Sequence, residues 1–277
     1  MRLGGQVFIQ NTDPQSWAAA IRQEGYRAAV CPVQSNENDT TIQEYRAAAE
    51  HHGLLIAEVG AWSNPISPDH EVRCKALEYC KAQLDLAERI GARVCVNIAG
   101  SRGAQWDGPH PDNFSDDTFS LIVDTVREII DAVKPKSAYY ALETMPWVLP
   151  DSADTYLALV KAIDREQFAV HLDPVNMIAS PRIYYRNAEM ITDFFTKLRP
   201  YIKSAHAKDI RLGGNLTVHL EEVLPGTGAL DYKVFLSELS RLDPDTPLII
   251  EHLPDEVQYR KAAAFIRETA ASLQIEL

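Results

Sequence analysis

The chain has 277 residues, 46% of them hydrophobic, which is enough for a large core and excludes an intrinsically disordered protein. Its 39 acidic and 27 basic residues give a formal net charge of −12, so we expect no general binding to nucleic acid. Apolar runs are too short for a membrane helix of about 20 residues or for a signal peptide, which predicts a cytoplasmic protein without membrane contact.

Eight short runs of β-branched and apolar residues predict strands. In chain order they cover residues 6–10, 28–33, 54–60, 93–100, 139–145, 168–173, 202–208 and 247–253. Segments with apolar residues three and four positions apart predict helices between them, and the last of these covers 255–274. Gly25, Gly53 and Gly91 follow helical segments, where a left-handed C-cap is favoured.

Strands that alternate with helices predict βαβ units and a parallel sheet. Eight units favour a closed (β/α)8 TIM barrel that forms a single domain over residues 1–277. The alternative, an open doubly wound sheet, would usually carry a glycine-rich turn after its first strand, and residues 10–17 contain no glycine. Long stretches at 101–118, 146–153 and 174–189 follow strands, so in a barrel they would lie at the C-terminal face, where active sites form.

The last four predicted strands each carry a polar residue near the end, namely Glu143, Asp173, His206 and Glu251. Because side chains alternate between the two faces of a strand, all four can point into the barrel mouth together. Alone, each would be interpreted as a helix cap or a salt-bridge partner. Three carboxylates together repel one another unless a cation lies among them, so the set predicts one divalent metal ion. Oxygen ligands with one nitrogen suit Mn²⁺, Mg²⁺ or Co²⁺, with Zn²⁺ or Fe²⁺ as further candidates.

The segments ALETMP (141–146), HLDPVN (171–176), AHAKD (205–209) and IIEHL (249–253) resemble the sugar phosphate isomerase/epimerase family, which has a xylose isomerase-like barrel. That group includes ketose 3-epimerases, hydroxypyruvate isomerase, inosose dehydratase and, more distantly, endonuclease IV. The resemblance covers most of the chain and includes residues 56–69, 96–103, 106–117 and 225–232.

The resemblance implies a metal that polarises the carbonyl of a hydroxy-ketone, and a proton transfer through a cis-enediolate. It implies that Glu143 and Glu251 are both metal ligands and acid/base groups, whereas Asp173 and His206 mainly hold the ion. It also implies a homodimer or homotetramer. Asn176 stands where sugar epimerases of the family often have a histidine, which argues against a ketose 3-epimerase specifically.

Six further residues are candidates for substrate binding: His110, Trp62, Glu58, Asn176, Lys208 and Arg211. Each except Asn176 has a structural alternative, such as an exposed loop histidine, a packing aromatic or a member of an ion pair. His171 is interpreted as a core histidine, and residues 180–187 as a lid or a dimer contact.

The leading hypothesis is therefore an isomerase or epimerase of a free or phosphorylated sugar. A dehydratase of an inosose or a similar keto-polyol is the alternative, because it would begin with the same proton removal. An endonuclease IV-like repair enzyme is disfavoured, because that chemistry needs a three-zinc cluster with more histidines on the early strands and this chain is acidic. A barrel without catalysis is disfavoured because competent residues fill all four ligand positions.

Overall fold

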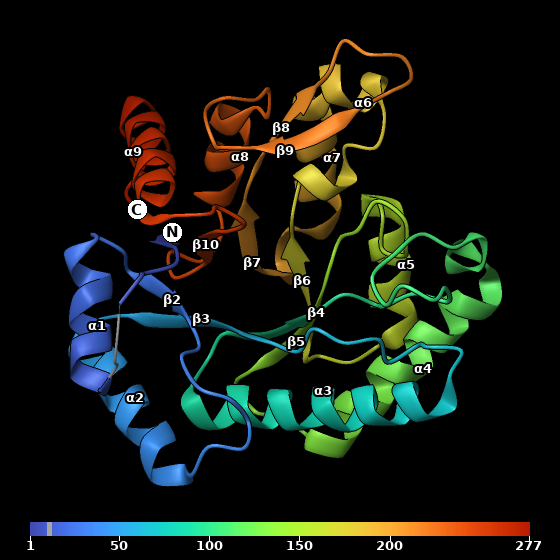
Figure 1. The fold of residues 1–277 in the computed structure, drawn as a ribbon, viewed down its shortest axis with the longest axis horizontal. Helices are drawn as coiled ribbons and strands as arrows, with labels where there is room; N and C mark the ends of the chain where they lie inside the picture. The colour runs from blue at the N-terminus through green and yellow to red at the C-terminus, as the bar shows by residue number, and fades with distance from the viewer. Residues whose placement is uncertain (10–12) are drawn as a thin grey trace.

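The computed structural model describes residues 1–9 and 13–277. Eight strands close into a barrel in the order β1-β10-β7-β6-β5-β4-β3-β2, as Figure 1 shows. The barrel strands are β1 (Arg2–Gly4), β2 (Ala28–Val30), β3 (Leu55–Gly60), β4 (Val94–Asn97), β5 (Tyr139–Glu143), β6 (Phe168–Leu172), β7 (Ile202–Ala207) and β10 (Pro247–Ile250). Neighbouring strands are parallel, which confirms the predicted (β/α)8 TIM barrel.

Helices surround the barrel (Figure 1). The α-helices are α1 (Pro14–Gln23), α2 (Asp39–His51), α3 (His70–Ile90), α4 (Asp116–Val133), α5 (Ala153–Ile163), α6 (Pro181–Tyr185), α7 (Asn187–Leu198), α8 (Tyr232–Leu239) and α9 (Glu256–Ser272), and the 3-10 helices are η1 (Pro111–Phe114), η2 (Val175–Met177) and η3 (Arg199–Tyr201). Asp69 starts α3 by accepting hydrogen bonds from two backbone amides, and Gly91 ends it in the left-handed conformation. No helix in the described part of the chain is long and apolar enough to cross a membrane.

The predicted first strand at 6–10 is wrong. The strand lies earlier, at Arg2–Gly4, where Leu3 pairs with Leu248 of β10 and Gly4 with Ala28 of β2. Gln6–Ile9 form no regular structure, and residue 10 lies outside the described residues. A short run with Gly4 and Gly5 carries a weak strand signal, but a Cβ at Gly4 would lie 2.5 Å from the Ala28 carbonyl oxygen, so a glycine is needed there. The other predicted strands are found, although most end earlier than expected.

A β-bulge in β3 determines where one acidic side chain points. Ala29 of β2 pairs with Ile56, whereas the next residue, Val30, pairs with Glu58, so Ala57 is an extra residue in β3. Such an insertion changes the face to which the following residues point. Glu58 consequently pairs with Val94 and faces the barrel interior, where Val94 packs with Ala141 and Ala169.

Sequence analysis predicted no strand between β7 and α8, but the structure has an antiparallel hairpin there. Its strands are β8 (Asp209–Leu212) and β9 (Leu220–Val223), and the hairpin extends beyond the end of β7 in Figure 1. The Asp209 carboxylate accepts hydrogen bonds from the backbone amides of Gly226, Gly228 and Leu230. These bonds fasten the returning loop to the barrel, so the hairpin is held over the mouth.

Candidate active site and its cavity

The four polar residues at the ends of β5, β6, β7 and β10 converge at the barrel mouth. One ligand atom from each of Glu143, Asp173, His206 and Glu251 lies within 4.8 Å of the corresponding atoms of the others. His206 Nδ1 is 2.8 Å from Glu251 Oε1 and 3.3 Å from Glu143 Oε1. Asp173 and His206 are fully buried, and Glu251 retains 18% of its side-chain exposure. The parallel strands deliver these side chains to one point because their carboxyl ends share one rim.

Residues next to the cluster orient two of the carboxylates. Asn176 Nδ2 donates a hydrogen bond of 3.1 Å to Glu143 Oε1. The backbone amide of Val175 donates to Asp173 Oδ1 at 2.9 Å. The turn after β6 thus orients two carboxylates: that of Asp173, which directly follows β6, and that of Glu143 at the end of β5.

Lys208 extends from the end of β7 into the same cluster. Its Nζ lies 2.6 Å from Glu251 Oε1, 2.8 Å from Asp173 Oδ2 and 3.6 Å from Glu143 Oε1. A fourth carboxylate, Glu222 of β9, is 3.9 Å away. The side chain of Lys208 is only 2% exposed, so its charge is screened little by water. Lys208 is the permanent cation of this site.

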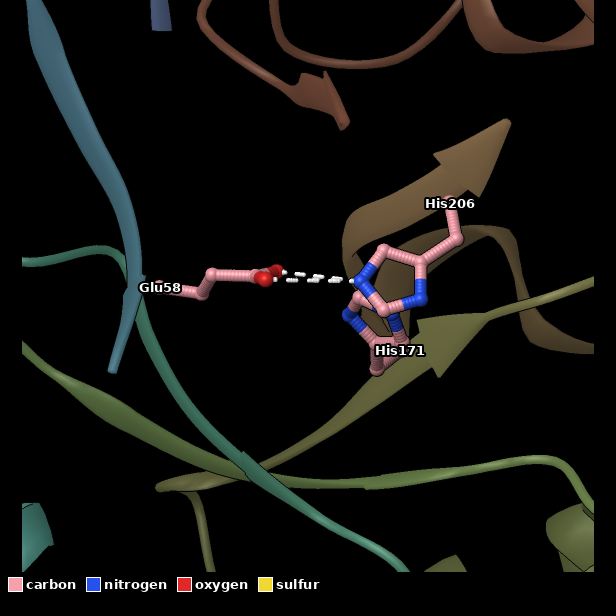
Figure 2. Close-up of side chains that lie close together, drawn as sticks. All are labelled: Glu58, His171 and His206. Atoms are coloured by element: carbon pink, nitrogen blue, oxygen red, sulfur yellow. Dashed lines mark hydrogen bonds and ion pairs between the residues drawn. The ribbon is translucent and has the colours of Figure 1, made fainter. Parts of the chain in front are cut away.

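Two further barrel residues contact His206 on its other side. Figure 2 shows Glu58 reaching from β3 toward His206, with His171 close to the same ring. Glu58 Oε2 is 3.3 Å from His206 Nε2, and the centroids of the two imidazole rings are 4.0 Å apart. His171 Nδ1 lies 2.6 Å from Ser204 Oγ. His171 is completely buried, as expected for a core histidine, yet it touches the site.

The electrostatics of the site reflect an excess of negative charge. Burial alone would lower the pKa of His206, but the carboxylates of Glu251, Glu58 and Glu143 hold it well above its usual range. Burial raises the pKa of Glu143 to about 7. Burial also opposes ionisation of Glu251, but His206 and Lys208 outweigh it and hold the pKa of that carboxyl below its usual range. The two glutamates therefore differ in their protonation equilibria although both approach the same imidazole nitrogen.

The donor set fits a divalent cation. Four acidic side chains, those of Glu58, Glu143, Asp173 and Glu251, are packed at the site with only one lysine and one histidine. Asp173 Oδ2 and Glu251 Oε1 are buried, and both lie close to the Lys208 ammonium, at 2.8 Å and 2.6 Å. Oxygen atoms of this kind, with one imidazole nitrogen, are the ligands that Mn²⁺, Mg²⁺ and related ions take. The buried cluster is thus consistent with a divalent metal site.

Glu143, Glu251 and Lys208 line a cavity of about 790 Å³, and the fully buried Asp173 and His206 lie behind them. Four of the six residues predicted to bind substrate line this cavity, namely Glu58, Trp62, Asn176 and Lys208. His110 and Arg211 are not among its lining residues. His110 accepts a hydrogen bond from the Asp112 amide at the start of η1, and Arg211 forms an exposed ion pair with Glu221. A role for either residue in substrate binding stays a prediction.

The lining residues that the sequence analysis missed include Trp106, Trp147 and Glu222. The tryptophans lie in the long loops after β4 and β5, and their size and apolar character in loops was a usable signal. Glu222 could not be found in the same way, because its position depends on the unpredicted hairpin.

Comparisons with known proteins agree with this architecture. The family model described as "Xylose isomerase-like TIM barrel" matches residues 18–269. A 3-dehydroshikimate dehydratase of Bacillus anthracis is 27% identical over 145 residues, which make up 52% of this chain and 46% of that protein. The chain thus matches about half the length of this curated relative.

Solved structures share the fold over nearly the whole chain. A probable 3-DHS dehydratase from Bacillus anthracis is 19% identical with a TM-score of 0.69, and the match covers 95% of this chain and 94% of that one. A D-psicose 3-epimerase from Clostridium cellulolyticum with D-tagatose is 16% identical (TM-score 0.65; coverage 95% and 92%). A protein from Mycobacterium smegmatis in complex with magnesium is 17% identical (TM-score 0.67; coverage 95% and 91%). Identities this low show the fold alone, but with the family model they lead to one conclusion: the chain belongs to the xylose isomerase-like TIM barrel family.

Proposed function

We propose that this protein is a metal-dependent isomerase or epimerase that moves protons on a small, sugar-like hydroxy-ketone. The observation that carries the proposal is the convergence of Glu143, Asp173, His206 and Glu251 within 4.8 Å, with Glu143 and Glu251 lining a cavity large enough for a small-molecule substrate. These four residues would hold one ion, with Mn²⁺, Co²⁺ or Mg²⁺ as the first candidates and Zn²⁺ or Fe²⁺ after them. The similar structure from Mycobacterium smegmatis was solved in complex with magnesium, which supports a divalent metal in this protein.

A bound divalent ion would supply Lewis-acid polarisation of a substrate carbonyl. Glu143 and Glu251 both line the cavity, so one carboxylate can remove the proton next to the carbonyl and the other can return a proton elsewhere. Asn176 orients Glu143 through its hydrogen bond to Oε1, and Lys208 holds Glu251 in place. Trp62 offers an aromatic face to the C–H surface of a sugar, and Glu58 can accept a hydrogen bond from a hydroxyl.

The charges around the cavity favour an unphosphorylated substrate. Five acidic residues line it, namely Glu58, Asp107, Glu143, Glu222 and Glu251. The lining cations among the described residues are Lys208 and His252, and carboxylates contact both of them: Lys208 contacts the cluster, and His252 Nδ1 lies 3.2 Å from Glu222 Oε2. A phosphate needs a free Arg or Lys, or a cluster of backbone amides, to balance its charge. We therefore place free ketoses and keto-polyols before sugar phosphates.

A dehydratase is the second candidate, and the 27% identity to a 3-dehydroshikimate dehydratase favours it. It would use the same proton removal and then expel a hydroxyl group on the next carbon. 3-Dehydroshikimate carries a carboxylate, which meets the same shortage of free cations as a phosphate. An uncharged keto-polyol, such as an inosose, is the better candidate for this reaction.

The test is a substrate screen in deuterium oxide. The protein is stripped of metal with a chelator, reloaded with Mn²⁺, Co²⁺ or Mg²⁺, and incubated with ketoses, sugar phosphates and inososes while NMR follows the products. Hydrogen exchange next to the carbonyl without loss of water supports an isomerase or epimerase. An unsaturated or dione product supports the dehydratase, whereas neither exchange nor a new product with any compound in any metal form contradicts both.

A further inference from the structure

The four tryptophans of this chain all line the cavity. Trp17 belongs to α1 and is buried, whereas the other three follow β3, β4 and β5 and remain partly exposed, at 42% for Trp62, 40% for Trp106 and 37% for Trp147. Partly exposed aromatic side chains that surround one opening mark a binding surface more often than scattered ones do. Trp62, Trp106 and Trp147 are called the tryptophan wall below.

Two of the three side chains of the wall, Trp147 and Trp62, are held in place before any ligand binds. Trp147 Nε1 donates a hydrogen bond to the Asp107 carbonyl oxygen, and the Trp147 carbonyl accepts one of 2.9 Å from Asn113 Nδ2. Trp62 lies against Gly60, where a Cβ would be only 2.4 Å from its Nε1. A rigid aromatic surface loses little conformational entropy on binding, so its contact area contributes more fully to affinity.

The cavity as a whole is larger than a sugar needs. Val7, Val30, Met145 and Pro146 also line the cavity and add apolar surface to that of the tryptophan wall. The volume of about 790 Å³ lies in the range of about 300–1,000 Å³ that is typical for drug-sized ligands. A hexose has only about a dozen non-hydrogen atoms and is well below that size. Carboxylates bind the polar end of a ligand, and indole faces bind flat, weakly polar groups.

We propose that the substrate is an uncharged hydroxy-ketone that carries a flat aromatic or apolar group, as an aryl glycoside does. Its polyhydroxylated ketone lies at the carboxylate cluster, and its flat group packs on the tryptophan wall. This inference rests on the proposed function, because it uses the cluster as the reacting end. If the flat group is attached through the anomeric carbon, that carbon is no longer a carbonyl, so the reacting ketone lies at another ring carbon.

The experiment compares two probes that differ only in this group. Phenyl and methyl β-D-ribo-hexopyranosid-3-ulose are titrated into the Mg²⁺-loaded full chain, and dissociation constants are measured by calorimetry. We expect the phenyl glycoside to bind at least about tenfold more tightly, because the ring adds aromatic contact and buried apolar area. Trp62→Ala and Trp106→Ala should each lower the ratio of the two dissociation constants, methyl over phenyl, to about threefold or less, because each removes one aromatic face of the wall.

Tyr185→Ala is the matched control, because Tyr185 is 75% exposed and does not line the cavity. It should leave the ratio unchanged. Equal affinity of the two probes for the native chain would overturn the inference, as would a ratio that survives both tryptophan substitutions. If the two substitutions instead change the molecular mass measured by light scattering and leave the ratio intact, the wall binds a second copy of the chain and the inference is wrong.

Hydrogen exchange of the methyl probe in deuterium oxide separates this inference from the proposed function. If hydrogen exchanges but the two probes bind with equal affinity, the proposed function stands and the inferred aromatic or apolar substrate group is wrong. A strong phenyl preference without exchange of either probe supports a binding cavity of the inferred shape and contradicts the proposed chemistry on this ring ketone.

Discussion

The two sides of the cavity are built in different ways. The carboxylate cluster (Glu143, Asp173 and Glu251 together with His206) lies at the ends of four barrel strands. Its members are buried or mostly buried, and His206 and Lys208 link them. The tryptophan wall stands on loops after β3, β4 and β5, and its members are partly exposed. Strand ends are rigid and their spacing is set by the barrel, whereas loops differ in length and sequence at little cost to the fold.

This contrast indicates that the strand ends and the loops serve different functions. Groups that transfer protons need positions accurate to a fraction of an ångström, which strands provide. Groups that select a substrate need shape and apolar area, which loops can supply. We therefore expect substitutions in the cluster to change the chemistry and those in the wall to change mainly substrate preference.

The largest expected effect comes from Glu143→Gln or Glu251→Gln. Each change keeps the volume and removes the proton-accepting group, so the rate of proton transfer should fall by about 10²–10⁴-fold or more. The measurement is hydrogen exchange or turnover of a substrate found in the screen, with thermal unfolding to verify the fold. Glu221→Gln, an exposed acid on β9 outside the cavity lining, is the control and should retain its rate. Full turnover in either cluster variant would refute the acid/base assignment.

Lys208→Met tests whether the ammonium balances the carboxylates in the absence of metal. Removing one partner of a buried ion pair costs about 3–5 kcal/mol, because the remaining charges stay buried. The metal-free variant should therefore unfold at a much lower temperature than the metal-free native chain, and saturating Mg²⁺ should restore part of the loss. An equal loss of unfolding free energy with and without metal would show that the ammonium and the ion do not compensate the same charges.

Removal of metal should destabilise the native chain. An ion at about 100 times its Kd contributes about 2.7 kcal/mol to the free energy of unfolding, so a chelator should lower the Tm by several degrees. His206→Ala should lower the metal content measured by elemental analysis and abolish the response of the Tm to added metal. An unchanged stoichiometry in this variant would exclude His206 as a ligand.

Gly60→Ala is the smallest change and acts on the wall alone. The added Cβ would lie 2.4 Å from Trp62 Nε1, so the indole must move. Gly60 has no left-handed backbone, so we expect less than about 1 kcal/mol of destabilisation but a weaker preference for the phenyl probe. Gly214→Ala is the control, since nothing lies within 4 Å of a Cβ there. An unchanged preference would mean that Trp62 does not contact the flat group.

The barrel and the location of its cluster could be predicted from the sequence because both depend on local patterns. Alternating strands and helices define the βαβ units, and the polar residues at 143, 173, 206 and 251 interrupt buried strands where the C-terminal rim must be. The sequence also showed that Lys208 follows His206 by two residues and so lies on the same face, and the structure places its ammonium in the cluster.

Other features were decided by tertiary structure alone. Glu58 reaches His206 because of the β-bulge at Ala57, and a bulge depends on the pairing of two strands that are distant in sequence. Glu222 approaches Lys208 only because the hairpin folds over the mouth. His110 and Trp106 lie in the same loop, yet only Trp106 lines the cavity. Loop residues carry no periodic pattern, so contacts across space decide which side chain faces the ligand.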